Sequence, residues 1–175
     1  MKSRKLVTCA MLIALHTVLS LFVSINLGNM KITFDALPII VGAMLYGPVD
    51  GMLIGLLGAF FAQLLSYGLS PTTILWILPA AFRGFFVGFF AKMLGDRFKG
   101  KALLVVIVLS SLLVTALNTG VMAADAIFYG YYSYAYVFGA LIFRIISGVI
   151  TAVLYAVVVP ELLKYLKQAG IHSEI

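Results

Sequence analysis

Residues 102–121, ALLVVIVLSSLLVTALNTGV, run for twenty positions without a charged side chain. A helix of about 20 apolar residues is long enough to cross the hydrocarbon core of a bilayer, which is roughly 30 Å thick. The apolar residues do not alternate with polar ones, as they would in a strand of a transmembrane barrel. This stretch therefore predicts a transmembrane helix.

The composition extends this prediction to the whole chain. Of the 175 residues, 63% are hydrophobic and 10% are charged, and the mean hydropathy is +1.15. An average soluble domain is about 45–50% apolar and about 25% charged, and a chain this short cannot bury so much apolar surface in water. We therefore expect residues 1–175 to form a single membrane domain, an all-α integral membrane protein in a lipid bilayer.

Glycine, proline and charged residues divide the chain into a predicted bundle of six transmembrane helices. Their approximate ranges are 6–27, 35–46, 49–67, 72–94, 102–121 and 136–166. The first range follows a basic start, as the apolar part of a cleavable signal peptide does. It is nevertheless long enough to span the membrane, so we interpret it as a retained helix.

The basic residues predict the orientation of this bundle. They cluster before the first helix, around the loop between the fourth and fifth helices, and after the sixth: Lys2, Arg4, Lys5, Lys92, Arg97, Lys99, Lys101, Lys164 and Lys167. With six crossings these segments share one side, which the positive-inside rule makes cytoplasmic. Both termini are then cytoplasmic. The net charge of +6 needs no nucleic acid partner to explain it.

Residues that carry catalytic chemistry are sparse in the sequence. His16 and His172 are the only histidines, Cys9 is the only cysteine, and no GxxxxGK[ST] phosphate loop is present. We therefore expect no enzyme activity, cofactor or metal site, and any ATP-driven transport requires a separate ATPase subunit. A self-contained secondary transporter and a membrane-embedded enzyme remain alternatives, although neither internal repeats nor a catalytic cluster is evident.

Two arginines lie inside predicted helices. Arg83 is about 11 residues, or roughly 16 Å, into the fourth helix, and Arg144 is about 8 residues, or roughly 12 Å, into the last. A charge at such depth costs at least ~2.5–3.5 kcal/mol, so each needs a partner. Asp35, Asp125 or a backbone carbonyl could be that partner. Alternatively, at least one guanidinium binds the anionic group of a ligand, because it matches a carboxylate in two hydrogen bonds.

The fourth helix places Trp76, Pro79 or Ala80, and Arg83 on one face, because they recur at spacings of three, four and seven. This face offers an aromatic platform two turns above a cation, although a tryptophan there also suits an interfacial anchor. Five tyrosines follow the fifth helix and could form a lid or anchor the interface: Tyr129, Tyr131, Tyr132, Tyr134 and Tyr136. The further candidate ligand-binding residues are Asn29, Lys31, Asp35, Gln63, Tyr67, Asn118 and Asp125.

Small residues mark predicted packing faces. Gly51, Gly55 and Gly58 on the third helix, and Gly84 and Gly88 on the fourth, are spaced for close backbone approach. The first helix carries Ala10 and Ala14, an AxxxA pair that is also compatible with ordinary packing inside the chain.

Residues 31–38 read KITFDALP and residues 43–48 read AMLYGP, followed by Gly51 and Gly55. Together with the AxxxA pair, this pattern resembles the substrate-binding S component of an energy-coupling factor (ECF) transporter, a family of small bacterial vitamin-uptake proteins. The resemblance covers nearly the whole chain and is closest to the folate-type branch.

The resemblance implies that Ala10 and Ala14 dock onto the transmembrane coupling subunit, which acts together with two ATPase subunits. It also implies a vitamin bound with high affinity near the outer face by loop 1 and helices four to six, and a location in the plasma membrane of a bacterium. Folate-type members carry FPGFT before the fourth helix, whereas residues 70–79 here read SPTTILWILP. Two deep arginines favour an anionic vitamin, so folate, pantothenate and other acidic vitamins stay alternatives.

Overall fold

The computed structural model describes residues 2–27 and 30–171. In chain order the elements are α1 (Lys2–Phe22), β1 (Ser24–Leu27), β2 (Met30–Thr33), α2 (Ala36–Tyr46), α3 (Pro48–Tyr67), α4 (Thr73–Leu94), a 3-10 turn (Gly95–Arg97), α5 (Lys101–Phe128), α6 (Tyr134–Phe138) and α7 (Leu141–Gln168). The predicted helical architecture is thus confirmed for most of the chain.

Five helical segments of the described chain are long and apolar enough to span a membrane, and the second predicted helix is not among them. α2 has 11 residues, so at 1.5 Å per residue it is roughly 16 Å long, about half of the hydrocarbon core. The prediction that all six helices cross the membrane is therefore not confirmed for the second of them. Instead, strand β2 precedes Asp35. The chain then continues as α2, which is about half as long as a membrane-spanning helix.

A two-stranded hairpin precedes α2, so the chain is not purely α-helical. β1 pairs with β2 in antiparallel register, with Ser24 opposite Thr33 and Ile25 opposite Ile32. The prediction that the first helix runs to residue 27 is wrong, because α1 ends at Phe22. β-branched residues at 23, 25, 32 and 33 favour strands.

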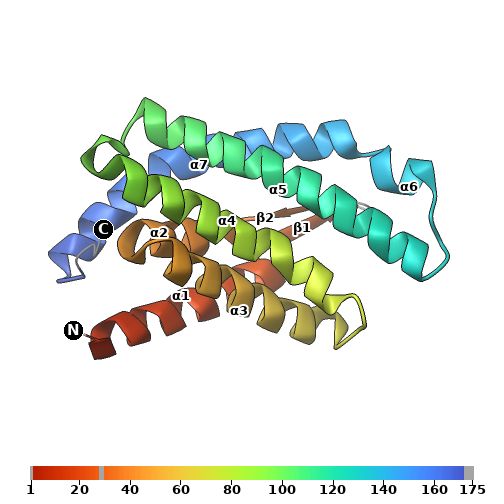
Figure 1. Ribbon diagram of the computed structural model, residues 1–175, viewed down its shortest axis with the longest axis horizontal. Coiled ribbons are helices and arrows are strands. Elements are labelled where there is room, and N and C mark those ends of the chain that lie inside the picture. Colours follow the sequence, from red (N-terminus) through yellow and green to blue (C-terminus); the bar gives the residue numbers. More distant parts are fainter. Residues whose placement is uncertain (1, 28–29, 172–175) are drawn as a thin grey trace.

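The long helices form an elongated bundle with both termini at the same end (Figure 1). The turn between α4 and α5 lies at that end as well, and the turns after α3 and α5 lie at the other. All three predicted basic clusters therefore meet at one end of the bundle. That this end faces the cytoplasm stays a prediction from the positive-inside rule. We refer to the opposite end as the outer end.

α3 and α4 pack backbone to backbone through glycines. A Cβ added at Gly51 would lie 2.7 Å from the carbonyl oxygen of Gly84, and one added at Gly55 or Gly88 would meet backbone atoms of Ala80 or Pro48. This confirms the predicted close approach of the two glycine stripes. Gly58 allows close packing against α1 and not against α4, because a Cβ there would lie 2.6 Å from Cδ2 of His16 on α1.

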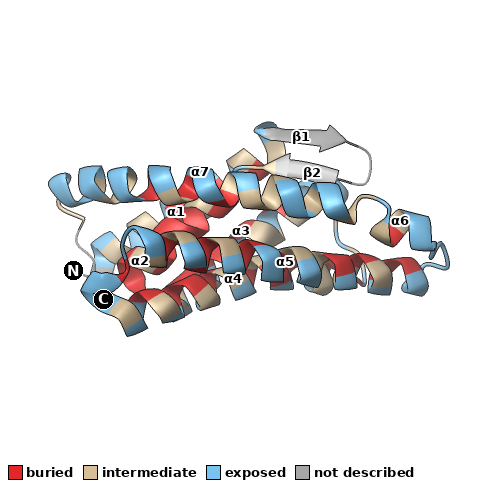
Figure 2. Ribbon diagram, turned by 90° about the horizontal axis from the view of Figure 1, so that it is seen from above, coloured by how far each residue is buried: buried red, intermediate tan, exposed pale blue. Residues whose placement is uncertain are grey.

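The core is concentrated around α2, where Ile39, Ile40 and Leu45 are at most 1% exposed. The outward faces of the long helices carry exposed apolar side chains, as lipid contact requires (Figure 2). α2 contacts α1, α3, α4 and α7, and it fills about half the length of the bundle. The half toward the outer end therefore lacks a central helix and leaves room for a cavity.

Two further helix boundaries differ from prediction. α5 continues to Phe128, one and a half to two turns beyond the predicted end at residue 121, so Asp125 lies on a helix. The last predicted helix is divided into α6 and α7 at Gly139 and Ala140. Both boundaries change where polar residues lie along the bundle, and both affect the cavity.

Candidate functional site

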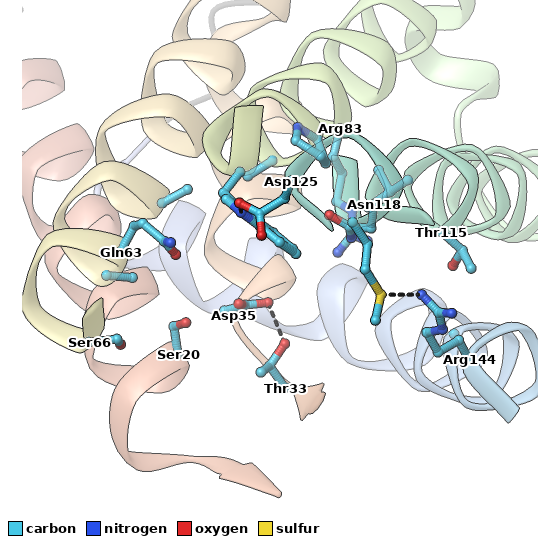
Figure 3. Close-up of a pocket in the computed structure, with 18 of the residues that line it drawn as sticks. Ser20, Thr33, Asp35, Gln63, Ser66, Arg83, Thr115, Asn118, Asp125 and Arg144 are labelled. Carbon is cyan, nitrogen blue, oxygen red and sulfur yellow. Dashed lines mark hydrogen bonds between the residues drawn. The ribbon is translucent and has the colours of Figure 1, made fainter. Parts of the chain in front are cut away.

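A cavity of about 690 Å³ occupies the outer half of the bundle. This volume lies within the roughly 300–1,000 Å³ that is typical of small-molecule sites. α1, α3, α4, α5 and α7 form its walls, and Ile39 of α2 contributes to its floor. The predicted residues brought together in its lining are Asp35, Gln63, Tyr67, Trp76, Arg83, Asn118, Asp125 and Arg144 (Figure 3).

Asp125 is surrounded by hydrogen-bond donors. Oδ1 accepts a bond from Thr72 Oγ1 at 2.5 Å and one from Trp76 Nε1 at 3.2 Å, and Oδ2 accepts one from the hydroxyl of Tyr131. The side chain is 7% exposed. This carboxylate also raises the pKa of Tyr131 well above its usual range, so the hydroxyl keeps its proton. Asp125 therefore ties together α4, α5 and the loops on either side of the cavity mouth.

Arg83 lies ten residues into α4, roughly 15 Å from its start. Its Nε is buried and has no hydrogen-bond partner, and no ion pair in the described part of the chain involves its guanidinium. The predicted structural partners Asp35 and Asp125 are therefore not paired with Arg83. Pro79, Ala80 and Trp76 line the cavity beside it, which confirms that this face of α4 points inward.

Arg144 is placed differently from its prediction. Because α7 begins at Leu141, Arg144 lies in the first turn of that helix, not eight residues deep. Its Nη1 approaches Thr119 Oγ1 and Met122 Sδ at 3.4 Å each, and its Nη2 donates to the carbonyl oxygen of Val137. A backbone carbonyl was one of the partners expected from the sequence. Both Nη atoms of Arg144 thus have protein partners, whereas its Nε, like that of Arg83, is buried without one.

The floor of the cavity joins the hairpin to three helices. His16 Nδ1 lies 2.7 Å from the carbonyl oxygen of Asp35, and Asp35 Oδ1 accepts a 2.7 Å bond from Thr33 Oγ1. The hydroxyl of Tyr155 on α7 donates to the carbonyl oxygen of Thr33 at 3.1 Å. These polar contacts therefore join α1, β2, α7 and the residue before α2 beside the cavity.

Two predicted loop residues cannot be assigned to the cavity. Asn29 lies outside the described residues, and Lys31 belongs to β2 with a side chain outside them. Of the five tyrosines, Tyr129, Tyr131 and Tyr136 line the cavity. Tyr132 and Tyr134 do not line it, and all of the five except Tyr136 are exposed.

Several lining residues carried no signal in the sequence. These are His16, Ser20, Thr33, Ser66, Ser70, Thr72, Thr115, Ser147, Thr151 and Tyr155. Most are serines and threonines, which are common in membrane helices and usually bond their own backbone, so composition does not distinguish them. The sequence does not indicate the role of His16, because its partner is a backbone carbonyl nineteen positions away.

The AxxxA pair lies on the surface. Ala10 and Ala14 are exposed on α1, away from the cavity. Within the described part of the chain, no cluster of three or more His, Cys, Asp or Glu side chains could hold a metal ion.

Comparison with known proteins identifies a family and several related structures. Residues 4–164 match the sequence model of the family described as ECF transporter, substrate-specific component. A crystal structure of FolT bound with folic acid is 22% identical with a TM-score of 0.64, and the match covers 89% of this chain and 91% of that one. The S component of a bacterial ECF transporter is 20% identical with a TM-score of 0.64, over 95% of this chain and 99% of that one. No protein with a curated description matches significantly.

Proposed function

The chain belongs to the family of substrate-specific components of ECF transporters, and we propose that it binds an anionic vitamin, with folate as the first candidate, in the outer cavity. It is a substrate-binding subunit of a transporter and not an enzyme. In this proposal its membrane is the plasma membrane of a bacterium. The membrane-spanning coupling subunit and two ATPase subunits supply the energy.

The guanidinium of Arg83, which lines the cavity with its Nε buried and unpartnered, carries this proposal. A cation near mid-membrane is costly without a counter-charge, and Asp125, which could have compensated it, already accepts bonds from Thr72, Trp76 and Tyr131. A carboxylate on a ligand would satisfy the guanidinium in two parallel hydrogen bonds. An acidic substrate therefore fits the cavity better than a neutral or cationic one.

Folate is favoured among acidic vitamins by two observations. FolT, whose structure was determined with folic acid, shares the fold over most of the chain. Trp76 lines the cavity on the same face of α4 as Arg83, so an aromatic ring system attached to the carboxylate can stack on the indole.

Pantothenate is a second candidate because of the segment before α4. Ser70 and Thr72 stand where folate-type members carry the FPGFT stretch, and both line the cavity. Ser70 Oγ and Thr72 Oγ1 lie 3.3 Å apart. These hydroxyls make the outer mouth more polar, which suits a smaller substrate with hydroxyl groups.

Calorimetric titration of the purified protein with folic acid and with pantothenate tests the substrate. We expect either folic acid or pantothenate to bind. Thiamine, a cationic vitamin similar in size to pantothenate, should not bind. Binding of thiamine but neither acid would reject the proposal. Uptake in cells that lack the coupling subunits tests the mechanism, because uptake without them would indicate a self-contained transporter.

A further inference from the structure

The cavity has two chemically different walls (Figure 3). Arg83, Asn118, Thr115 and Arg144 come from α4, α5 and α7 and lie together on one side. The other side is formed by α1 and α3, and it presents the uncharged groups of Ser20, Gln63 and Ser66. Asp35 lies between the two sides in this view. An anion bound by Arg83 accounts for one wall and leaves the other without an assigned role.

His16 is the most buried polar residue of the uncharged wall. Its side chain is 3% exposed and lines the cavity. Gly58 of α3 makes room for the ring, since a Cβ at position 58 would lie 2.6 Å from Cδ2. The glycine at position 58 therefore leaves space for a polar imidazole ring. An aliphatic side chain on α1 could have filled the same space without a polar group.

The bond to Asp35 determines which nitrogen of His16 carries the proton. A carbonyl oxygen can only accept, so Nδ1, at 2.7 Å from the carbonyl oxygen of Asp35, is the donor. In the neutral ring Nε2 is then an acceptor, and no residue in the described ranges donates to it. The ring is held in position by one nitrogen and has the other available.

Asp35 has an acceptor available as well. Thr33 occupies Oδ1 at 2.7 Å, and none of the described side chains bonds to Oδ2 or forms an ion pair with this carboxylate. Both His16 and Asp35 line the cavity.

We propose that His16 and Asp35 form a second recognition subsite, which accepts hydrogen bonds from uncharged N–H or O–H groups of the ligand. The inference rests on the proposed function, because it assumes that Arg83 binds the anionic end of the same molecule. It defines the substrate class more closely. The ligand is an acid that carries amine, amide, ring N–H or hydroxyl donors at a distance from its carboxylate, and a plain carboxylic acid is rejected because two buried acceptors would stay unpaired.

Two substitutions of His16 separate recognition from structure. In His16→Asn the amide nitrogen takes the place of Nδ1 and keeps the bond to Asp35, but the acceptor at Nε2 is lost. In His16→Gln the longer amide presents its oxygen near the position of Nε2 and gives up the bond to Asp35. Each variant is purified, checked for a monodisperse elution profile and an unchanged melting temperature, and titrated with folic acid and pantothenate.

For the acid that binds the wild type, we expect His16→Asn to weaken binding about 10- to 100-fold and His16→Gln to restore at least part of the loss. Wild-type affinity in His16→Asn, or an equal loss in both variants, would overturn the proposal, since the second result indicates a purely structural histidine. Asp35→Asn, which keeps an oxygen for Thr33 and can place a donor where Oδ2 was, gives an independent measurement. We expect a loss of similar size, and unchanged binding would remove Asp35 from the subsite.

Arg83→Met distinguishes failure of this inference from failure of the proposed function. Loss of binding in Arg83→Met with normal binding in His16→Asn would reject the subsite and keep the anion site. Normal binding in Arg83→Met with loss in His16→Asn would reject the anion site and show that the substrate is recognised at the floor. A wild type that binds neither acid rejects the proposed function together with the substrate class derived from it.

Discussion

The indole Nε1 of Trp76 donates a hydrogen bond to Oδ1 of Asp125 over 3.2 Å. The bond joins α4 to α5 near the cavity mouth and fixes the indole on the helix face that also carries Arg83. Because Thr72 and Tyr131 bond to the same carboxylate, Asp125 is already supplied with donors. The contact therefore fixes the orientation of Trp76, and Asp125 forms hydrogen bonds with residues other than Arg83.

Substitution of Arg83 is expected to remove most of the ligand affinity. Loss of a buried, charge-assisted hydrogen bond costs about 2–5 kcal/mol, or roughly 30-fold to several thousandfold in Kd. Arg83→Ala should show this loss in calorimetric titration, and Arg83→Lys should retain part of the affinity because the charge remains without the bidentate geometry. Wild-type binding by a folded Arg83→Ala would return this arginine to a structural role and make Arg144 the better candidate.

Trp76→Ala should weaken binding by less than Arg83→Ala, about 1–3 kcal/mol if the ligand ring stacks on the indole as bases stack on aromatic side chains. Trp76→Phe is the matched control, because it keeps an aromatic face and loses the bond to Asp125. We expect Trp76→Phe to bind more tightly than Trp76→Ala in the same titration. Equal losses in the two variants would indicate that Trp76 acts through Asp125 and not by stacking.

Gly84→Ala should destabilise the fold. The new Cβ would meet the carbonyl group of Gly51, which is backbone and cannot move aside as a side chain can. Overpacking of this kind costs roughly 1–3 kcal/mol or more. Gly120→Ala is the control, since it lies in α5 with nothing within 4 Å of the added Cβ, and alanine is the better helix former. Thermal unfolding in detergent measures the melting temperatures of the two variants. Equal melting temperatures of Gly84→Ala and Gly120→Ala would contradict the close packing of α3 and α4.

Ala10→Trp and Ala14→Trp should block assembly with the coupling subunit and leave ligand binding unchanged. Both alanines are exposed on α1, and a packed helix crossing cannot absorb the added volume. Ala116→Trp, at an exposed position of α5, is the matched control. Co-purification with the coupling subunits measures the effect, and a wild-type yield of complex from Ala10→Trp would refute the docking role.

The tyrosine-rich segment 129–136 and residues 30–34 should exchange their backbone amides more slowly when ligand is bound. Both adjoin the cavity, so both must open for a substrate to enter and close behind it. The tightly packed part of α3 around Gly51 serves as an internal reference whose exchange should not change. Equal exchange of segment 129–136 with and without ligand would indicate that the tyrosines only anchor the membrane interface.

Part of the cavity was predictable from the sequence because it depends on helix geometry alone. Trp76 and Arg83 are seven positions apart, so any helix places them on one face, and a deep arginine must turn inward. The glycines of α3 and α4 were predictable for the same reason. The depth of Arg144 in its helix was not predictable. Gly139 and Ala140 interrupt the helix, and the largely apolar residues around them do not indicate that break.

The sequence by itself determined that the chain lies in a membrane, which end carries the positive charge and which helix faces pack closely, because these follow from local hydropathy and periodicity. Only the tertiary structure decided that α2 is half-length and that a hairpin precedes it. It also decided that Asp125 is held by Thr72 and Trp76, and that His16 contacts Asp35. These contacts join residues 19 to 53 positions apart, and such pairings depend on how the helices pack against one another, which no local pattern records.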